Sequence, residues 1–172
     1  MFEKFGEMNY EELMRTAAAE KAEGDLEALT TLAMENGLEK EDAEDYMDDL
    51  VDTLATPYMA AVARIEAQAK ELKIEGRLKD QKDYIIQMLM EGGEVDEKMC
   101  LAVCRKGKYL KECLARILSY SSERMIQIPE EIVKLAEFRG NGKKEKMRGP
   151  IYEGGGTKKD FKRIAREYYR EA

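Results

Sequence analysis

The chain has 172 residues, of which 44% are hydrophobic and 38% charged, and its formal net charge is −7. That length suits one folded domain with a substantial core, and the high charged fraction requires a densely ionic surface. No stretch approaches the roughly 18 apolar residues of a membrane span, and residues 1–10 carry acids rather than an apolar signal segment. The sequence therefore predicts a cytoplasmic protein that does not enter a membrane.

The chain contains no histidine and three closely spaced cysteines, Cys100, Cys104 and Cys113. Without histidine, Ser-His and Cys-His nucleophile pairs and histidine-containing metal sites are excluded. Three cysteines with no fourth soft ligand do not make a tetrahedral zinc site, and an odd number is not typical of a secreted disulfide framework. We therefore predict reduced thiols in a helical core, no cofactor, no metal site and no catalytic residues, as in a binding protein rather than an enzyme.

Charge is distributed unevenly along the chain. Residues 1–60 hold 4 basic and 17 acidic side chains (net −13), whereas residues 61–172 hold 25 basic and 19 acidic ones (net +6). This asymmetry indicates either charged partners or two solvated faces of one protein.

Helical signals dominate the first 54 residues. Asn9 with Glu12 predicts a capping box and a first helix that ends at Gly24, and a second short helix runs from Asp25 to about residue 36. Apolar residues at three- and four-residue steps predict a third helix over 39–54, with Leu50 and Val51 in its core stripe.

The opposite side of that third helix carries a row of carboxylates. The candidate partner-binding residues on this acidic face are Glu41, Asp42, Asp45, Asp48, Asp49 and Asp52. Like charges at this spacing destabilise an isolated helix, so the row indicates either simple solubility or a cationic partner. A row of carboxylates can also imitate the phosphates of a nucleic acid and dock into the basic channel of a nuclease.

Five more helices are expected between residues 56 and 136. Thr56-Pro57 is a helix start, and Ile128-Pro129 opens a short helix by the same rule. The intervening segments 78–90, 96–105 and 109–122 have helical spacing, and the last of these places Leu118 in the core. The fold class is therefore mostly α, a multi-helix single domain.

Glycines change the character of the chain after residue 138. Asn141-Gly142 predicts either a small β-hairpin near 136–150 or a plain loop. The Gly154–Gly156 run precedes a capping box of Thr157 and Asp160, and it is either an anion-binding helix entry or a flexible linker. We divide the chain into an acidic-to-mixed helical domain, 1–138, and a glycine-rich basic segment with a C-terminal helix, 139–172, that packs on the same domain.

Basic side chains cluster in this last segment. The candidate nucleic-acid or anion contacts are Lys143, Lys144, Lys146, Arg148, Lys159, Arg163, Arg166 and Arg170. Tyr152, Tyr168 and Tyr169 lie among them, and basic residues interleaved with aromatic ones are typical of phosphate contact and base stacking. The alternative is that the tyrosines belong to the core and the charges face solvent.

Four segments carry a family resemblance. "MFEKFGEM" (1–8), "EDAEDYMDDL" (41–50), "MCLAVCRKGKYLKECLARIL" (99–118) and "MRGPIYEG" (147–154) resemble a family of small accessory proteins carried on integrative and conjugative elements of gut Firmicutes. The stretch "KGKYLKECLARI" is also similar to PcfK-like conjugation-accessory proteins. Inhibitors of type II-A Cas9, the anti-CRISPR proteins, occur among such mobile-element genes, so the resemblance implies protection of a mobile element from Cas9. It brings no catalytic motif.

Two functional hypotheses follow. In the first, the chain is an anti-CRISPR protein that binds Cas9, or Cas9 with its guide RNA, through charged surfaces. In the second, it is a conjugation-accessory protein that binds DNA or a transfer protein, with DNA or RNA contact through the basic C-terminus. The many Met and Tyr residues on short helices are consistent with a homodimer.

Overall fold

Nine helices and six short strands make up residues 4–171, the part of the chain that the computed structural model describes. The helices are α1 (Tyr10–Glu23), α2 (Leu26–Glu35), α3 (Lys40–Met47), α4 (Pro57–Leu72), α5 (Arg77–Gln87), α6 (Glu97–Val103), α7 (Leu110–Glu123), α8 (Glu130–Leu135) and α9 (Lys158–Arg170). The strands are β1 (Met90–Glu91), β2 (Glu94–Val95), β3 (Met125–Gln127), β4 (Glu137–Gly140), β5 (Lys143–Lys146) and β6 (Tyr152–Gly154). The predicted mostly helical class is confirmed.

Most helices begin where the sequence places a capping side chain. Asn9, Asp25, Thr56, Asp96 and Thr157 each accept a hydrogen bond from a backbone N–H in the first turn of the helix that follows. Each such bond satisfies a donor that the helix itself leaves without a partner.

The third helix is shorter than its apolar spacing predicted. It ends at Met47, and the prediction of a helix over 39–54 is wrong for its last seven residues. Asp49 adopts a left-handed conformation, with φ of 58°, and the Leu50 N–H donates to the Asp45 carbonyl at 2.9 Å. The chain then turns, so Leu50 is 71% exposed and Val51 42% exposed instead of buried.

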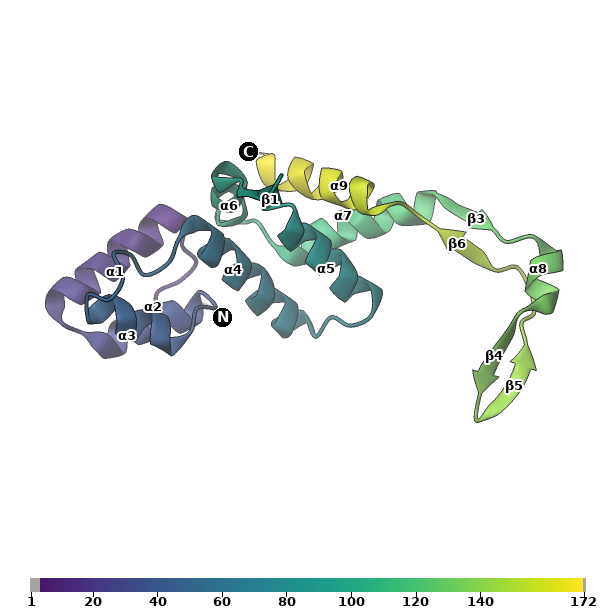
Figure 1. Ribbon diagram of the computed structural model, residues 1–172, viewed down its shortest axis with the longest axis horizontal. Coiled ribbons are helices and arrows are strands. Elements are labelled where there is room, and N and C mark those ends of the chain that lie inside the picture. The colour runs from purple at the N-terminus through teal and green to yellow at the C-terminus, as the bar shows by residue number, and fades with distance from the viewer. Residues whose placement is uncertain (1–3, 172) are drawn as a thin grey trace.

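The helices form two neighbouring groups joined by α4. Helices α1, α2 and α3 pack together, and α4 packs with α5, α6 and α7, while α9 lies against α5, α6 and α7 (Figure 1). One continuous cluster of buried apolar side chains, from Leu13 to Tyr169, runs through both groups. Leu118, expected in this core, is instead 59% exposed on α7.

A buried ion pair fastens the N-terminal segment to the body. The Arg64 guanidinium on α4 is 2.5 Å from the Glu7 carboxylate and also donates to the backbone carbonyls of Met8 and Cys104. Glu7 in turn accepts hydrogen bonds from the Tyr109 hydroxyl at 2.9 Å and the Gly107 N–H at 3.1 Å. Three segments far apart in the sequence therefore meet at one carboxylate.

Helix α7 is capped by side chains from other helices. Its first residue, Leu110, donates its N–H to the Gln68 side chain on α4 at 2.6 Å. The preceding residue, Tyr109, donates its N–H to the Tyr168 hydroxyl on α9 at 2.8 Å, and that hydroxyl donates to Glu112. These contacts fix α7 between α4 and α9.

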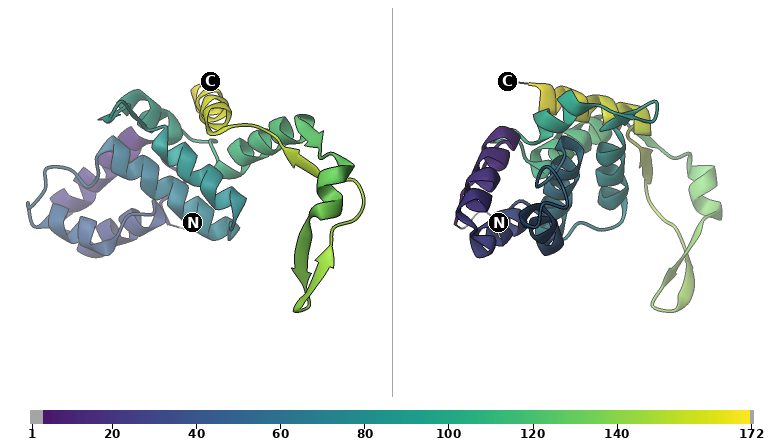
Figure 2. Two further views of the ribbon diagram at one scale, coloured as in Figure 1. Left: turned by 45° about the vertical axis from the view of Figure 1, so that its right-hand side comes forward. Right: turned by 60° about the vertical axis from the view of Figure 1, so that its left-hand side comes forward.

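Residues 124–156, here called the arm, leave the helical body between α7 and α9 and return to it (Figures 1 and 2). At its base β3 pairs antiparallel with β6, and Met125 lies opposite Gly154. Helix α8 follows, and the arm ends in the antiparallel hairpin β4–β5, so of the two alternatives for Asn141-Gly142 the structure has the hairpin and not the plain loop. The boundary drawn at residues 138 and 139 falls inside β4.

Within residues 4–171, no helix has both the length and the apolar character that crossing a lipid bilayer requires.

Candidate charged interfaces

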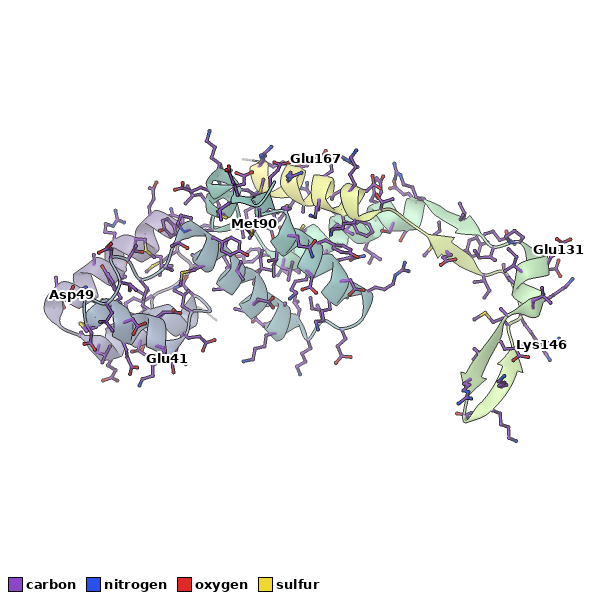
Figure 3. The ribbon with its side chains drawn as sticks, viewed as in Figure 1. Glu41, Asp49, Met90, Glu131, Lys146 and Glu167 are labelled. Atoms are coloured by element: carbon purple, nitrogen blue, oxygen red, sulfur yellow. The ribbon has the colours of Figure 1, made fainter. Side chains whose placement is uncertain are left out.

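The proposed acidic residues lie at one end of the molecule and the hairpin lysines at the other. Figure 3 places Glu41 and Asp49 in the group formed by α1, α2 and α3, and Lys146 on the arm at the opposite end. We call residues 9–52 the acid-rich lobe. The acidic part of the charge asymmetry thus lies at one end of the molecule, opposite the hairpin.

The acidic residues do not form one helical face. Glu41 and Asp45 lie on α3, whereas Asp48, Asp49 and Asp52 lie in the turn that follows it. The predicted row at helical spacing is therefore wrong beyond Met47, although the exposed positions Glu41, Asp45, Asp48 and Asp52 remain on the surface of one lobe.

Two of the six acids are engaged within the chain. Asp42 accepts the Glu39 N–H at 2.9 Å and so caps α3. Asp49 is 2.6 Å from the Lys21 ammonium, which also donates to the Tyr46 carbonyl at 2.5 Å. A cation at that carbonyl stabilises the negative end of α3. Asp42 is therefore engaged in the helix cap, and Asp49, although 85% exposed, pairs with Lys21. The other four acids are exposed.

The hairpin separates its charges between two faces. The turn Asn141-Gly142 has φ of 50° and 79°, which is the geometry of a two-residue type I′ turn. The resulting register places Arg139 opposite Lys144, and Glu137 opposite Lys146. Since directly opposite residues share a face of an antiparallel pair, Arg139, Lys144 and Lys146 lie on one face with Glu137. We call these three basic residues the cationic face.

Two further cations were proposed in this segment. Lys143, opposite Gly140, is exposed on the other face of the hairpin, and Arg148 lies at the bend of the arm. The segment that leads from β5 back to β6 turns at Gly149, which has φ of 82°, and Pro150. Arg148 and Lys134 line a cavity of about 450 Å³ at this bend, together with Glu130 and Val133. Arg148 is therefore exposed beside the hairpin without being part of the cationic face.

Three of the four proposed cations on α9 form ion pairs with neighbouring carboxylates. Arg163 pairs with Glu167 at 2.9 Å, Arg166 with Glu91 at 3.3 Å, and Arg170 with Asp96 at 3.6 Å. Arg166 is also only 28% exposed, less than Arg163 at 49% and Arg170 at 61%. Lys159 is exposed. The eight candidate cations thus divide between the arm and α9, and the arm holds the set with fewer ion pairs.

The start of α9 is occupied by its own carboxylate. Asp160 accepts hydrogen bonds from the Thr157 N–H at 2.9 Å and the Thr157 hydroxyl at 2.7 Å, and the hydroxyl bond chiefly lowers the pKa of Asp160 to about 2. A fixed negative charge at this helix end disfavours a second anion, so the anion-binding interpretation of Gly154–Gly156 loses its basis. Nor is the run a loose linker, because Gly155 is buried against Ser121 of α7.

Two of the three tyrosines near the basic residues belong to the core. Tyr168 is 3% and Tyr169 1% exposed, and their rings meet edge to face at 4.8 Å. Tyr152, on β6 of the arm, is 54% exposed. Stacking on a nucleic-acid base is therefore open to Tyr152 alone among these three.

The three thiols are buried in the helical core, as predicted. Burial raises the pKa of Cys100 to about 12, that of Cys104 to about 11 and that of Cys113 to about 12. Because the thiolate is the nucleophilic form, these side chains are chemically inert near neutral pH.

Sequence reasoning missed Arg139, the basic residue of the cationic face on β4. The signal was present, because a two-residue turn at Asn141-Gly142 sets the hairpin register and places Arg139 opposite Lys144.

Comparison with known proteins gives no relative: the sequence matches no family model, no curated protein and no solved structure.

Proposed function

We propose that this chain is a non-catalytic binding protein that inhibits a Cas9-type nuclease, or its complex with guide RNA, by direct contact through charged surfaces. The observation that carries the proposal is the separation of charge between the two ends of the molecule, with the acid-rich lobe at one end and the cationic face at the other (Figure 3). The choice of target follows the resemblance to accessory proteins of mobile elements proposed from four segments of the sequence, and the cleavage assay below tests it.

The acid-rich lobe is suited to a basic groove. Four of its carboxylates, Glu41, Asp45, Asp48 and Asp52, are exposed on a lobe whose fold is held by other side chains. A cationic channel that accommodates a nucleic-acid backbone offers complementary charge to such a surface. Electrostatic complementarity of this kind accelerates association and falls with rising salt concentration.

The direct experiment is a Cas9 cleavage assay with guide RNA and target DNA, to which the purified protein is added in excess. The test variant is Asp45→Lys, Asp48→Lys and Asp52→Lys combined. Residues 45 and 48 lie at the C-terminal end of α3, where basic side chains are favourable, and Asp52 is exposed in the turn beyond it, so the lobe is expected to stay folded. The matched control reverses three exposed acids elsewhere, Glu71→Lys, Glu75→Lys and Glu94→Lys.

Wild type and control are expected to block cleavage, and the lobe variant is expected to lose inhibition at least tenfold. Full inhibition by the lobe variant would refute docking through these carboxylates. Unimpaired cleavage in the presence of excess wild type would refute the target.

One observation favours a second candidate, the conjugation-accessory protein that binds DNA or a transfer protein. The hairpin carries Arg139, Lys144 and Lys146 together on one exposed face. Docking of the acid-rich lobe into a basic groove does not require this face. Intact Cas9 cleavage together with a shift of DNA in a gel would select this candidate.

A further inference from the structure

The hairpin β4–β5 places like charges where they oppose folding. Arg139 and Lys144 lie directly opposite each other, and like charges in that relation destabilise a strand pair. Glu137 is the one carboxylate on the same face, and it reaches only Lys144, at 3.6 Å. Between Phe138 and Gly149 the chain holds five basic side chains and one acidic one. Such a concentration of positive charge indicates an anionic partner.

The shape of the hairpin narrows the choice of partner. Seven of the eight residues in β4 and β5 are exposed, so the ribbon is covered on neither face. The hairpin stands away from the helical body at the end of the arm (Figures 1 and 2). The major groove of B-form DNA admits a two-stranded β-ribbon, whereas the major groove of A-form RNA is too narrow for protein side chains to read.

The negative net charge of the protein does not prevent this approach. The acid-rich lobe lies at the opposite end of the molecule from the hairpin (Figure 3). At physiological salt, charges in water are screened over about 8 Å, so the hairpin meets a polyanion through its own local field.

We infer that the hairpin β4–β5 binds double-stranded DNA by entering the major groove, with Arg139, Lys144 and Lys146 on the phosphates. This binding requires no nuclease and is therefore independent of the proposed inhibition. Phosphate contacts of this kind give affinity without sequence preference.

The test measures fluorescence anisotropy of a labelled 24-base-pair DNA duplex of arbitrary sequence, titrated with the full chain between 50 and 200 mM salt. The variant Arg139→Gln, Lys144→Gln and Lys146→Gln is compared with a matched control, Lys70→Gln, Lys79→Gln and Lys98→Gln, which removes three exposed lysines outside the arm. The arm variant is expected to bind at least tenfold more weakly at 100 mM salt, with a shallower salt dependence, and the control to bind like wild type.

A second variant tests the inference through a gain in DNA affinity. Glu137→Gln removes the carboxylate from the cationic face and is expected to tighten DNA binding about threefold, since an exposed ion pair of this kind is weak. An RNA duplex of the same sequence is expected to bind more weakly than DNA.

Three results would overturn the inference: equal affinity of the arm variant and the control, tighter binding of the RNA duplex, or no binding of DNA by wild type at 50 mM salt. Sedimentation of the same proteins without DNA measures self-association, and so tests whether a second copy of the chain is the partner instead of DNA. Self-association that the arm variant abolishes, with no DNA binding, would assign the hairpin to a contact between copies instead.

Discussion

The Arg64 guanidinium on α4 lies 2.5 Å from the Glu7 carboxylate, and the Arg64 side chain is only 5% exposed. This pair connects the segment before α1 to the helical body. The same carboxylate also accepts the Tyr109 hydroxyl and the Gly107 N–H, so its removal affects three segments at once.

We predict that Glu7→Ala lowers the free energy of unfolding by about 2–4 kcal/mol, because Arg64 stays buried with its carboxylate partner removed. Urea denaturation followed by circular dichroism measures the change. Glu71→Ala, at an exposed position on α4, is the control and is expected to change stability by less than about 0.5 kcal/mol. Equal effects of the two substitutions would show that the buried pair is not stabilising.

The N-terminal turn of α9 should depend on pH through Asp160. Its pKa is lowered to about 2, chiefly by the hydrogen bond from the Thr157 hydroxyl, from an ordinary value of 3.8. A folded-state pKa below the unfolded value gives stability that is complete above the unfolded pKa and is lost as pH falls through the folded pKa. The contribution is therefore expected to be complete above about pH 5 and to disappear between about pH 4 and 2.

NMR titration of the Asp160 carboxyl measures this pKa directly. Thermal unfolding of Asp160→Asn is expected to lose less stability than wild type between pH 4 and 2. Parallel losses in the two proteins would contradict the assignment.

The thiols should be unreactive in the folded protein. Burial raises the pKa of each to about 11 or 12, so almost no thiolate exists at pH 8. Ellman's reagent is expected to detect less than about one tenth of the thiols in native protein and all three in guanidinium chloride. Rapid reaction of a native thiol would show that the core around α6 and α7 opens easily.

The base of the arm should not tolerate a side chain at Gly155. The residue has φ of 108°, and a Cβ there would come within 2.7 Å of the Ser121 carbonyl oxygen. Gly93 has a similar φ of 91° with nothing within 4 Å of such a Cβ, which makes it a matched control.

Both substitutions to alanine strain the backbone, and only Gly155→Ala adds a collision. We expect it to destabilise the protein by about 2 kcal/mol more than Gly93→Ala, as measured by thermal unfolding. Equal melting temperatures would show that α7 shifts away at little cost.

Local signals predicted the helix starts well, because Asn9, Thr56 and Thr157 act on the backbone within three residues of themselves. The turn at Asn141-Gly142 was identified from a similarly local signal, although a plain loop was left as the alternative. The end of α3 was not predicted, and the Lys21 ammonium that contacts Asp49 there lies 28 residues away in the sequence. Apolar spacing alone suggested that the helix continued through Leu50 and Val51.

The candidate interfaces were predicted as residue types but not as surfaces. The acids and the hairpin lysines were identified from charge, whereas their placement at opposite ends follows from packing between distant helices. The β3–β6 pairing joins Met125 to Gly154 through short strands without apolar alternation, so no local pattern indicates it. The carboxylates that pair with Arg166 and Arg170 also lie in segments that are remote in the sequence.

The pairing of Met125 with Gly154 has a topological consequence. The chain leaves the helical body after α7 and re-enters it before α9 at neighbouring points, so the arm is an excursion that begins and ends in the same place. The arm can therefore be lengthened or shortened without changing how the helices of the body are connected. Both the sequence and the length of the arm can change while the helices of the body keep their packing.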